Sequence, residues 1–408
     1  MKALVIGGGI GGLTTALCLL EAGIEVELFE KSAALTEVGA GIQLSPNGVK
    51  VLAKLGLQNE IDAIAFPPVS LDMRMGKSGR KIFSIPIKER APAQYGAPYY
   101  HVHRADLMNV LERALRTRNP SAVKLGKEFV SYEEHDKGIT ITCADGTQAH
   151  GDVLVGADGI HSRVCSQLHG NTPARFTGNV AWRFVVPATP QLKSLVPPSA
   201  TIWVGPKRHA VTYYLRRGEL INFVGVVERG EWQKESWTEA GDTADLQADF
   251  QGWATPITAL TTQVLQCFRW ALFDRNPLPT WSKDRVTLLG DAAHAMLPFL
   301  AQGAVMGIED AWVLSRCLMA SQDVPTALQS YETARKPRTS RVQAGARRQM
   351  GLYHQVGTLK QLSVYGPMWL ASSFAPAFVN ARQDWLYAFD VTADTAPNAA
   401  ASSASRSR

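Results

Sequence analysis

The sequence of 408 residues predicts a mixed α/β fold, in which a parallel-sheet part is interleaved with a mostly antiparallel sheet and followed by C-terminal helices. Three observations predict it. A strand, a glycine loop, a helix and a second strand follow one another within residues 3–30. Short alternating apolar segments occupy residues 70–100 and 176–274. Helix-sized patterns then return at 303–320 and 325–355, so the two parts must be interleaved along the chain.

The first element pair is a βαβ unit. Residues 3–6 form a short apolar run, and residues 13–22 show a helical pattern that Gly23 closes as a C-cap. Residues 26–30 then alternate as a strand does. Such a unit requires a parallel sheet with a right-handed crossover, so the first part is Rossmann-like.

The second part is predicted from residues 180–186, 210–215 and 220–227, which are apolar segments separated by turns rich in proline and glycine. The last residues are mostly Ala, Ser, Thr and Pro, which bury too little surface to become ordered. We therefore expect a discontinuous nucleotide-binding domain (1–70, 100–175 and 275–350), a sheet domain (71–99 and 176–274), a helical segment (351–390) and a disordered tail (391–408).

The composition is that of a packed globular protein, with 46% hydrophobic and 19% charged residues. The net charge of +6 favours small anionic ligands or simply reflects a solvated surface, and no block of basic residues indicates nucleic-acid binding. Five scattered cysteines without a C-x-x-C pair indicate neither disulfides nor a zinc site. No apolar stretch reaches about 18 residues, so we expect a soluble cytoplasmic protein without a membrane partner.

The glycine loop at residues 7–12 matches G-x-G-x-x-G and lies between a predicted strand and helix. Glycines let the backbone approach a pyrophosphate, which the helix N-terminus attracts. The bare pattern also occurs in turns without a ligand. Glu30, 18 residues beyond Gly12, strengthens the interpretation because a carboxylate there accepts the hydroxyls of an adenosine ribose. It would repel a 2′-phosphate, so the expected dinucleotide is FAD or NAD.

Two further segments place an aspartate after a glycine or alanine at the end of an apolar strand: Asp158 before Gly159, and Asp291 after Gly290. Each would lie at the carboxyl edge of a parallel sheet, where ligands bind. A glycine-bearing loop at residues 298–311 then enters a helix, whose N–H groups can face a flavin ring. Each aspartate taken singly is more often a turn or cap residue, but a plain NAD dehydrogenase needs neither segment, so together they favour FAD.

The order of these three motifs resembles that of the single-component (class A) flavoprotein monooxygenases of the aromatic hydroxylase type. The resemblance runs from residue 3 to about 390, with subsidiary matches at 39–47, 103–107, 331–338 and 385–390. Within the family, the chain is most similar to the salicylate, 3-hydroxybenzoate and 6-hydroxynicotinate hydroxylases.

The resemblance implies non-covalent binding of FAD by Gly7, Gly9, Gly11, Gly12, Glu30, Lys31, Gly41, Gln43, Arg104, Asp158, Asp291, Gln302, Gly303, Ala304 and Val305. Arg104 would neutralise the phosphates, Asp291 would hold the ribityl chain, and residues 302–305 would line the ring. NADH or NADPH would dock transiently near Asp158, because the sequence has no second dinucleotide fingerprint.

The implied activity is that of an NAD(P)H-dependent flavin monooxygenase in aromatic catabolism, which uses O₂ and a flavin C4a-hydroperoxide to hydroxylate a small aromatic. The substrate would carry a hydroxyl and, in one variant of the hypothesis, a carboxylate that decarboxylative hydroxylation could remove. Two alternatives stay open. One is epoxidation or hydroxylation of a larger quinolone or polyketide-like ring, and the other is an NAD(P)H oxidase or sensor that binds flavin without hydroxylating. A homodimer is one expected assembly.

The catalytic candidates are His209 and Tyr213, which are four residues apart on a predicted strand and therefore share a face. The resemblance implies that His209, with an ordinary pKa near ~6.5, deprotonates a ring hydroxyl and that Tyr213 binds the substrate. A packed histidine is the competing interpretation. Pro298 and Phe299 stand where the relatives have polar residues, which predicts a more apolar or differently decorated substrate.

Other histidines receive no catalytic role. His294 is expected to make a structural hydrogen bond beside Asp291. His101 and His103 have the spacing of a metal pair, but no carboxylate or cysteine completes a site, so no metal is expected.

Overall fold

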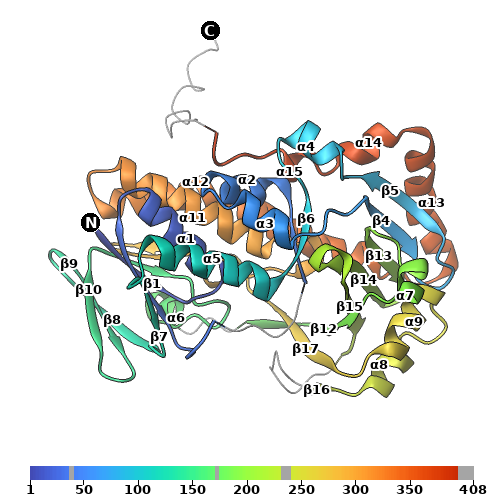
Figure 1. Cartoon of the computed structure of the whole chain (residues 1–408), viewed down its shortest axis with the longest axis horizontal. Coiled ribbons are helices and arrows are strands. Elements are labelled where there is room, and N and C mark those ends of the chain that lie inside the picture. The colour runs from blue at the N-terminus through green and yellow to red at the C-terminus, as the bar shows by residue number, and fades with distance from the viewer. Residues whose placement is uncertain (36–40, 171–173, 231–239, 394–408) are drawn as a thin grey trace, which may run out of the picture.

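The computed structural model describes residues 1–35, 41–170, 174–230 and 240–393. Two large sheets lie toward opposite ends of the long axis of the molecule, with helices packed between and around them (Figure 1). Residues 39–40 of the predicted motif and residues 394–408 of the predicted tail lie outside the described residues. Residues 391–393, which the sequence places in that tail, form a turn in which Asp390 accepts hydrogen bonds from Thr392.

The first large sheet has six strands in the order β18-β19-β11-β1-β2-β7. Its strands are β1 (Lys2–Ile6), β2 (Glu25–Glu30), β7 (Val123–Leu125), β11 (Val153–Gly156), β18 (Ser282–Lys283) and β19 (Val286–Leu288). The pairs β1–β2, β1–β11, β2–β7 and β11–β19 are parallel, as the βαβ pattern predicts. Helix α1 (Ile10–Glu21) follows the glycine loop, and Gly23 takes the left-handed φ of +73° that ends it.

The second large sheet has eight strands in the order β16-β17-β12-β15-β14-β13-β4-β5. Its strands are β4 (Ser70–Met75), β5 (Lys81–Pro86), β12 (Arg175–Pro187), β13 (Ala200–Gly205), β14 (Arg208–Leu215), β15 (Leu220–Glu228), β16 (Ala240–Gly241) and β17 (Cys267–Asp274). All neighbours pair antiparallel except β4 and β13, which pair parallel. The mixed α/β fold class, with its mostly antiparallel sheet, is therefore confirmed.

Smaller elements complete the fold. The sheet β8-β9-β10 comprises β8 (Phe129–His135), β9 (Gly138–Cys143) and β10 (Gln148–Gly151), and the pair β3-β6 comprises β3 (Gly41–Leu44) and β6 (Tyr100–His103). The other helices are α2 (Pro46–Lys54), α3 (Gln58–Ile64), α4 (Arg90–Tyr95), α5 (Arg104–Arg118), α6 (Arg163–His169), α7 (Pro190–Leu195), α8 (Thr243–Asp249), α9 (Thr255–Gln263), α10 (Asp291–His294), α11 (Gly303–Ala320), α12 (Val324–Tyr353), α13 (Thr358–Phe374), α14 (Pro376–Ala381) and α15 (Asp384–Tyr387), with single 3₁₀ turns η1 (Arg216–Gly218) and η2 (Pro298–Leu300). Helices α4, α7, α8 and α9 interrupt the ranges in which the sequence shows only strand patterns.

The two faces of the eight-stranded sheet differ in what covers them. One face packs large aromatic side chains under α8 and α9, including Trp182, Phe223 and Phe250. The opposite face carries smaller residues such as Val204 and Val226, which pack toward η2 and α12. In the middle of this second face, the side chains of Ile202, Val211 and Val224 are only partly buried.

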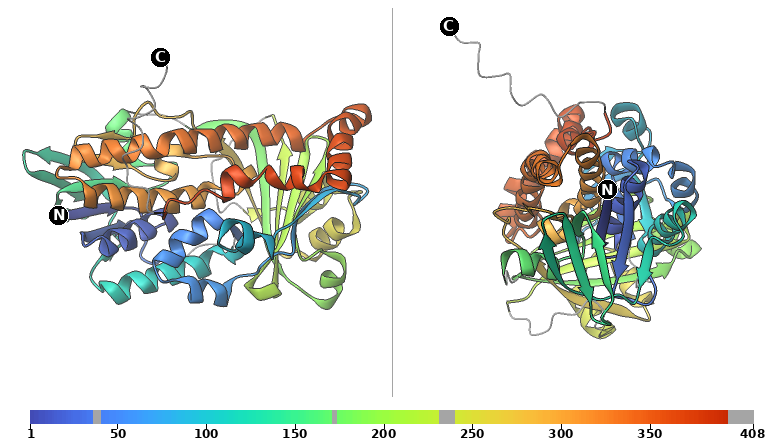
Figure 2. Two further views of the ribbon diagram at one scale, coloured as in Figure 1. Left: turned by 90° about the horizontal axis from the view of Figure 1, so that it is seen from above. Right: turned by 90° about the vertical axis from the view of Figure 1, so that its left-hand side faces the viewer.

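Helix α12 joins the two large sheets. Near its start, the Tyr331 hydroxyl donates a hydrogen bond to the Leu288 carbonyl on β19. At its end, the Tyr353 ring lies 5.0 Å from the His209 ring on β14. The helix runs along the length of the molecule (Figure 2). It thus delivers its last residues to the open face of the eight-stranded sheet.

Candidate active site

The glycine loop packs directly against the segment that follows β11. Gly7 has φ of +106°, and a Cβ there would lie 2.5 Å from the Ala157 carbonyl oxygen. A Cβ on Gly12 would lie 1.9 Å from the Gly7 carbonyl oxygen, so backbone atoms exclude any side chain at either position. Around Gly9, by contrast, nothing lies within 4 Å of an added Cβ. This part of the loop is therefore open to a ligand.

The third motif reaches the same place. A Cβ on Gly307 in α11 would lie 3.7 Å from the Cα atoms of both Gly11 and Gly290. Gly290 itself has φ of +61° and precedes Asp291 at the start of α10. All three motifs therefore meet at the carboxyl edge of the six-stranded sheet, where the crevice of such folds binds dinucleotides.

Glu30 ends β2 beside the glycine loop. Its carboxylate accepts hydrogen bonds from the Gly8 N–H at 2.7 Å and the Ser32 N–H at 2.8 Å. These bonds hold the carboxylate beside the glycine loop. The next predicted residue, Lys31, has an exposed side chain.

Asp158 supplies an unsatisfied buried oxygen. Its Oδ2 accepts hydrogen bonds from the backbone N–H groups of Arg163 and Val164 at the start of α6. Its Oδ1 is buried and accepts no hydrogen bond from the residues that the structure describes. Burial raises the pKa of Asp158, although hydrogen bonds from Ser162 and the backbone oppose it. Such an oxygen requires a partner, and a hydroxyl-bearing ligand such as FAD fits it.

The loop before α11 presents backbone donors. Gln302 is the N-cap of α11, so the first N–H groups at residues 303–305 have no partner within the helix. The Gln302 side chain is held by Ser45, whose Oγ accepts from Nε2 at 2.8 Å, and by Asn47, whose amide donates to Oε1 at 3.2 Å. The predicted flavin-facing backbone from Gln302 to Val305 is thus a rigid helix N-terminus, suited to an electron-rich ring edge.

Behind this N-terminus lies a group of charged and polar residues that we call the ionic cluster: the buried Asn47, His294, Glu309, Asp310 and Arg335, and Arg338, whose side chain is 8% exposed. Arg335 contacts Glu309 and Asp310 at 2.7 Å each, and Arg338 donates two hydrogen bonds of 2.8 Å to Glu309. Despite burial, which opposes the shift, Arg335 and Arg338 hold the pKa of Glu309 below its usual range. The cluster ties α2, α11 and α12 together under the loop at residues 302–305.

His294 belongs to this cluster. Its Nε2 lies 2.5 Å from Asp310 Oδ2, and both side chains are fully buried. Although burial opposes it, the His294 and Arg335 charges lower the pKa of Asp310. The environment is that of a structural hydrogen bond.

His209 and Tyr213 share the open face of the eight-stranded sheet, as their spacing predicts. Between them lies Val211, which pairs with Ile202 on β13 and Val224 on β15. These three side chains are partly exposed although they lie in the middle of the sheet. We call this row the apolar floor, and it can receive a flat ring.

His209 is buried at one end of the apolar floor. Its ring contacts Phe299 and Tyr353, with centroid distances of 5.2 and 5.0 Å. Burial, reinforced by the neighbouring His354, holds the pKa of His209 well below its usual value. His354 Nε2 lies 2.7 Å from His209 Nδ1, and its own Nδ1 lies 2.8 Å from Glu228 Oε1. The sequence did not indicate this chain, because His354 is 145 residues away from His209.

Tyr213 is buried at the other end of the floor. A Cβ on Gly41 would lie 2.4 Å from its ring, so β3 can approach only through a glycine. The His101 ring lies 4.7 Å away, and burial raises the pKa of the Tyr213 hydroxyl.

Two further residues predicted to bind FAD lie on or beside the strand pair β3-β6. On β3, Gln43 accepts a hydrogen bond from Tyr99 at 2.6 Å. Arg104 begins α5 directly after β6, the partner strand of β3.

Arg183 is a further candidate that the sequence interpretation missed. It lies on β12 in register with Val224 of the apolar floor, and its guanidinium lies 4.8 Å from the centre of the Trp270 ring. It is largely buried, and its charge opposes the rise in the pKa of Tyr213. The signal was available, since Arg183 is the one charged residue within the apolar segment 180–186.

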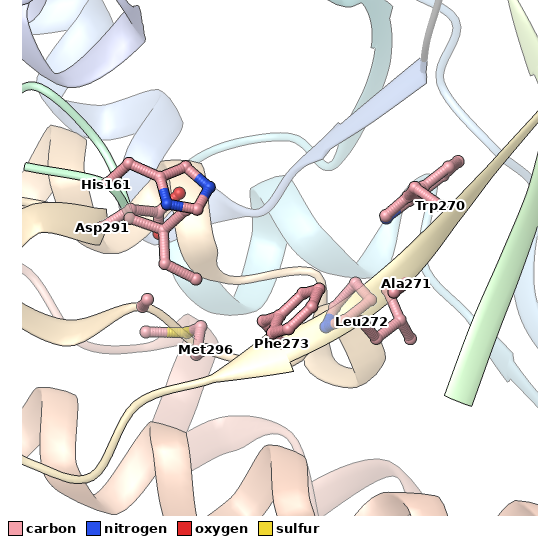
Figure 3. A pocket seen from close by; sticks show the side chains of 10 residues that line it. His161, Trp270, Ala271, Leu272, Phe273, Asp291 and Met296 are labelled. Atoms are coloured by element: carbon pink, nitrogen blue, oxygen red, sulfur yellow. The ribbon is translucent and has the colours of Figure 1, made fainter. Parts of the chain in front are cut away.

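A cavity of about 140 Å³ lies between α10 and β17. Asp291 and Met296 line one side, and Trp270 and Phe273 line the other (Figure 3). Pro298 also lines this cavity, whereas Phe299 turns toward His209. The two residues predicted to contact substrate together therefore face different spaces.

Among the described residues, no three or more His, Cys, Asp or Glu side chains are arranged so that they could hold a metal ion. Among the helices of the described ranges, none has the length and apolar character needed to cross a bilayer.

Comparison with known proteins agrees with this geometry. Residues 1–346 match the model of the FAD binding domain family. The chain belongs to this family. It is 39% identical over 352 residues to a 3-amino-4-hydroxybenzoate 2-monooxygenase of Streptomyces platensis, covering 86% of this chain and 88% of that protein. It is 35% identical over 343 residues to a 6-hydroxynicotinate 3-monooxygenase of Bordetella bronchiseptica, covering 83% and 88%.

A solved structure resembles the whole fold. The present chain superposes with a TM-score of 0.82 on Klebsiella pneumoniae HpxO complexed with FAD and uric acid. The two sequences are 28% identical, and the match covers 94% of this chain and 96% of the HpxO chain. The expected membership of the flavin monooxygenases, with FAD as cofactor, is therefore confirmed.

Proposed function

We propose that this flavin monooxygenase hydroxylates a small aromatic ring that bears a hydroxyl and a carboxylate, using NADH or NADPH and O₂. One observation carries the proposal. The open face of the eight-stranded sheet has an apolar floor with the imidazole of His209 at one end and the phenol of Tyr213 at the other. A buried cation, Arg183, lies in register with that floor.

We assign FAD to the edge where the three motifs meet, within residues 1–70, 100–175 and 275–350. Glu30 would accept the ribose hydroxyls, Asp158 and Asp291 would accept further hydroxyls, and the N–H groups at 303–305 would face the ring. When bound, FAD takes hydride from NAD(P)H and, once reduced, activates O₂ for transfer of one oxygen atom to an aromatic ring. The described side chains fit this group because Asp158 keeps a buried oxygen unsatisfied and the loop at Gly9 is open.

The substrate would lie on the apolar floor, within the sheet domain of residues 71–99 and 176–274. Arg183 would bind its carboxylate, since a guanidinium pairs well with that planar group. Tyr213 would hold the ring hydroxyl or its neighbour by a hydrogen bond. His209 would accept the hydroxyl proton at Nε2, which raises the electron density of the ring. Burial of all three groups excludes water, so their interactions with the substrate are strong.

The names of the relatives support this substrate class. The Streptomyces and Bordetella proteins are named for 3-amino-4-hydroxybenzoate and 6-hydroxynicotinate, each an aromatic with a hydroxyl and a carboxylate. Pro298 and Phe299 add apolar surface, which favours a substrate with few further polar groups.

The test begins with the purified, FAD-loaded protein. Oxidation of NADH and of NADPH is followed with and without a panel of hydroxybenzoates, aminohydroxybenzoates and hydroxynicotinates. We expect at least one acid to stimulate oxidation and to yield one hydroxylated product per nicotinamide oxidised. Stimulation without product would instead establish an oxidase, and no stimulation by any aromatic acid would contradict the proposal.

Variants then assign the roles. We expect His209→Ala to lower substrate-stimulated turnover and Tyr213→Phe to weaken substrate binding. Arg183→Gln should raise KM for the acid far more than for the same phenol without its carboxylate. Full and coupled turnover in both His209→Ala and Tyr213→Phe would remove these residues from the mechanism.

We further propose that the protein is a cytoplasmic homodimer. All five cysteines are free thiols, which suits a reducing compartment. Helix α13 exposes large apolar side chains that a second copy could cover, namely Leu359, Leu362, Trp369, Leu370 and Phe374. Light scattering should show a dimer for the wild type and for Gln329→Glu, and a monomer for Leu362→Glu. A monomeric wild type would contradict the assembly.

A further inference from the structure

His209 faces a physical difficulty as a base. Its side chain is only 1% exposed, and burial disfavours the imidazolium that forms when it accepts a proton. The pKa of His209 is accordingly held well below its usual value, first by burial and then by the neighbouring His354. A base in this position functions best if the proton it accepts can leave.

The structure provides an exit. His209 Nδ1 lies 2.7 Å from His354 Nε2, His354 Nδ1 lies 2.8 Å from Glu228 Oε1, and the Glu228 side chain is 41% exposed. The three groups come from β14, the end of α12 and the end of β15, so the tertiary fold alone aligns them. They connect the buried end of the apolar floor with solvent.

The carboxylate at the outer end determines the tautomers of both rings. An ionised Glu228 can only accept, so His354 Nδ1 carries hydrogen and donates to it. Burial lowers the pKa of His354, although Glu228 opposes this, so the ring is neutral and its Nε2 is an acceptor. His209 Nδ1 must therefore donate to His354, which leaves the lone pair on His209 Nε2. The hydrogen bond that the described residues make with the His209 ring is at Nδ1.

We propose that His354 and Glu228 are positioning residues that orient His209 as a base and carry the substrate proton to solvent. This inference rests on the proposed function. The substrate O–H bond breaks as an N–H bond forms at His209 Nε2, and the His209 Nδ1 proton moves to His354 Nε2. The His354 Nδ1 proton moves to Glu228, which releases it to water. The His209 and His354 rings are both neutral after these transfers. The same proton transfers in the reverse direction restore the starting tautomer of each ring.

The surroundings agree with a neutral relay. The two rings contact each other, the Phe299 and Tyr353 rings contact that of His209, and Arg208 is the cation whose charge acts on His354. Arg208 disfavours an imidazolium at His354, so it promotes transfer onward to Glu228. Burial also raises the pKa of Tyr353, which therefore stays protonated and cannot compete as a base.

The kinetic test uses the FAD-loaded full chain and the chromophoric probe 4-hydroxy-3-nitrobenzoate, whose visible absorbance rises when its hydroxyl ionises. Stopped-flow pH jumps on the bound probe measure the rate of phenolate formation in the wild type, Glu228→Gln and His354→Gln. Glu219→Gln is the matched control, because Glu219 is an exposed carboxylate at the opposite end of β15. The FAD absorbance spectrum and the probe Kd report that each variant is folded.

We expect Glu228→Gln and His354→Gln to slow phenolate formation about tenfold or more, within the range of acid–base contributions, while Glu219→Gln matches the wild type. Probe affinity should stay the same in all three. Equal rates in all variants would overturn the relay while leaving the hydroxylase proposal intact, since turnover with a hydroxybenzoate is measured separately.

A second measurement needs no aromatic ligand. ¹⁵N NMR of histidine-labelled holoenzyme, assigned with His209→Gln and His354→Gln, reports the tautomer of each ring. We expect both rings to be neutral and protonated at Nδ1. An imidazolium or an Nε2–H tautomer at either ring would overturn the relay, whatever substrate the enzyme uses.

Discussion

Two histidine–carboxylate pairs of this protein have nearly the same local chemistry and different surroundings. In the ionic cluster, His294 bonds to Asp310 at 2.5 Å, and at the end of α12, His354 bonds to Glu228 at 2.8 Å. Asp310 is fully buried, whereas the Glu228 side chain is 41% exposed. Asp310 also accepts from Arg335 and from the Gly290 N–H.

The difference shows that exposure of the carboxylate decides what such a pair can do. A proton on Asp310 would have no route to water and would break its bond to Arg335, so this pair stabilises the fold. A proton on Glu228 reaches water directly. Burial therefore makes one pair a structural anchor and exposure makes the other a proton exit.

The largest expected effect comes from breaking the ionic cluster. Arg335→Met should lower the free energy of unfolding by roughly 3–5 kcal/mol, because it leaves Glu309 and Asp310 buried without their shared cation. Urea denaturation of the holoenzyme measures this. The control Arg116→Met removes an i,i+4 ion pair with Glu112 in which the Arg116 side chain is 39% exposed. It should lower the free energy of unfolding by less than about 1 kcal/mol. Equal losses in both variants would contradict the assigned difference in burial.

A paired substitution compares the two carboxylates directly. Asp310→Asn should destabilise the protein by about 1.5–3 kcal/mol, since it removes charged hydrogen bonds in a buried site. Glu228→Gln should change stability by less than about 0.5 kcal/mol while it slows hydroxylation. Thermal melts and steady-state turnover of both variants give the answer. A stable Asp310→Asn protein with impaired turnover would reverse the two roles.

Acid unfolding should separate the two regions by pH. The folded-state pKa values of His209 and His101 are lowered by burial, that of His101 to about 3, so the unfolded state binds more protons. Their stability contribution is complete above the unfolded pKa of about 6.5 and is lost below it, by up to about 1.4 kcal/mol per pH unit for each histidine.

Glu309 and Asp310 also have lowered folded-state pKa values, but the pKa values of these carboxyl groups in the unfolded chain are about 4. Their contribution is complete above that pH and is lost only as pH falls further. The free energy of unfolding, measured by denaturation, should therefore fall as the pH is lowered from 7 to 5. We expect His209→Gln to reduce the slope of this fall and Asp310→Asn to leave it unchanged. An unchanged slope in His209→Gln would argue against a neutral buried ring.

A small effect on stability is also expected of Tyr213→Phe, which removes one hydroxyl at the far end of the apolar floor. We expect a change below about 1 kcal/mol in the free energy of unfolding and a several-fold rise in substrate Kd. Fluorescence titration with the best substrate of the panel measures this. A large loss of stability would mean that Tyr213 is a packing residue instead of a binding group.

Much of the cofactor region could be predicted from sequence. The motifs at residues 7–12, 158–159 and 290–291 are local turn patterns, and Gly7 and Gly12 are required by backbone contacts that any sequence with this loop must make. The parallel-sheet topology follows from the βαβ pattern, so their convergence also follows. The spacing of His209 and Tyr213 on one strand was equally readable, because a strand alternates its faces.

The rest of the site depended on contacts between distant segments. Pro298 and Phe299 are adjacent in sequence, yet the turn η2 directs them to different spaces. Helices α4 and α7–α9 were not predicted within the sheet segments, since short helices carry weak periodic signals.

The sequence by itself determined the fold class, the cofactor and the strand that carries His209 and Tyr213, because these depend on local backbone geometry and on short periodic patterns. Only the tertiary structure decided that His354 and Glu228 adjoin His209, that Arg183 adjoins the apolar floor, and that Asp310 is sealed from water. Burial and side-chain proximity are properties of the packed chain, and in this protein they decide which carboxylate can release a proton.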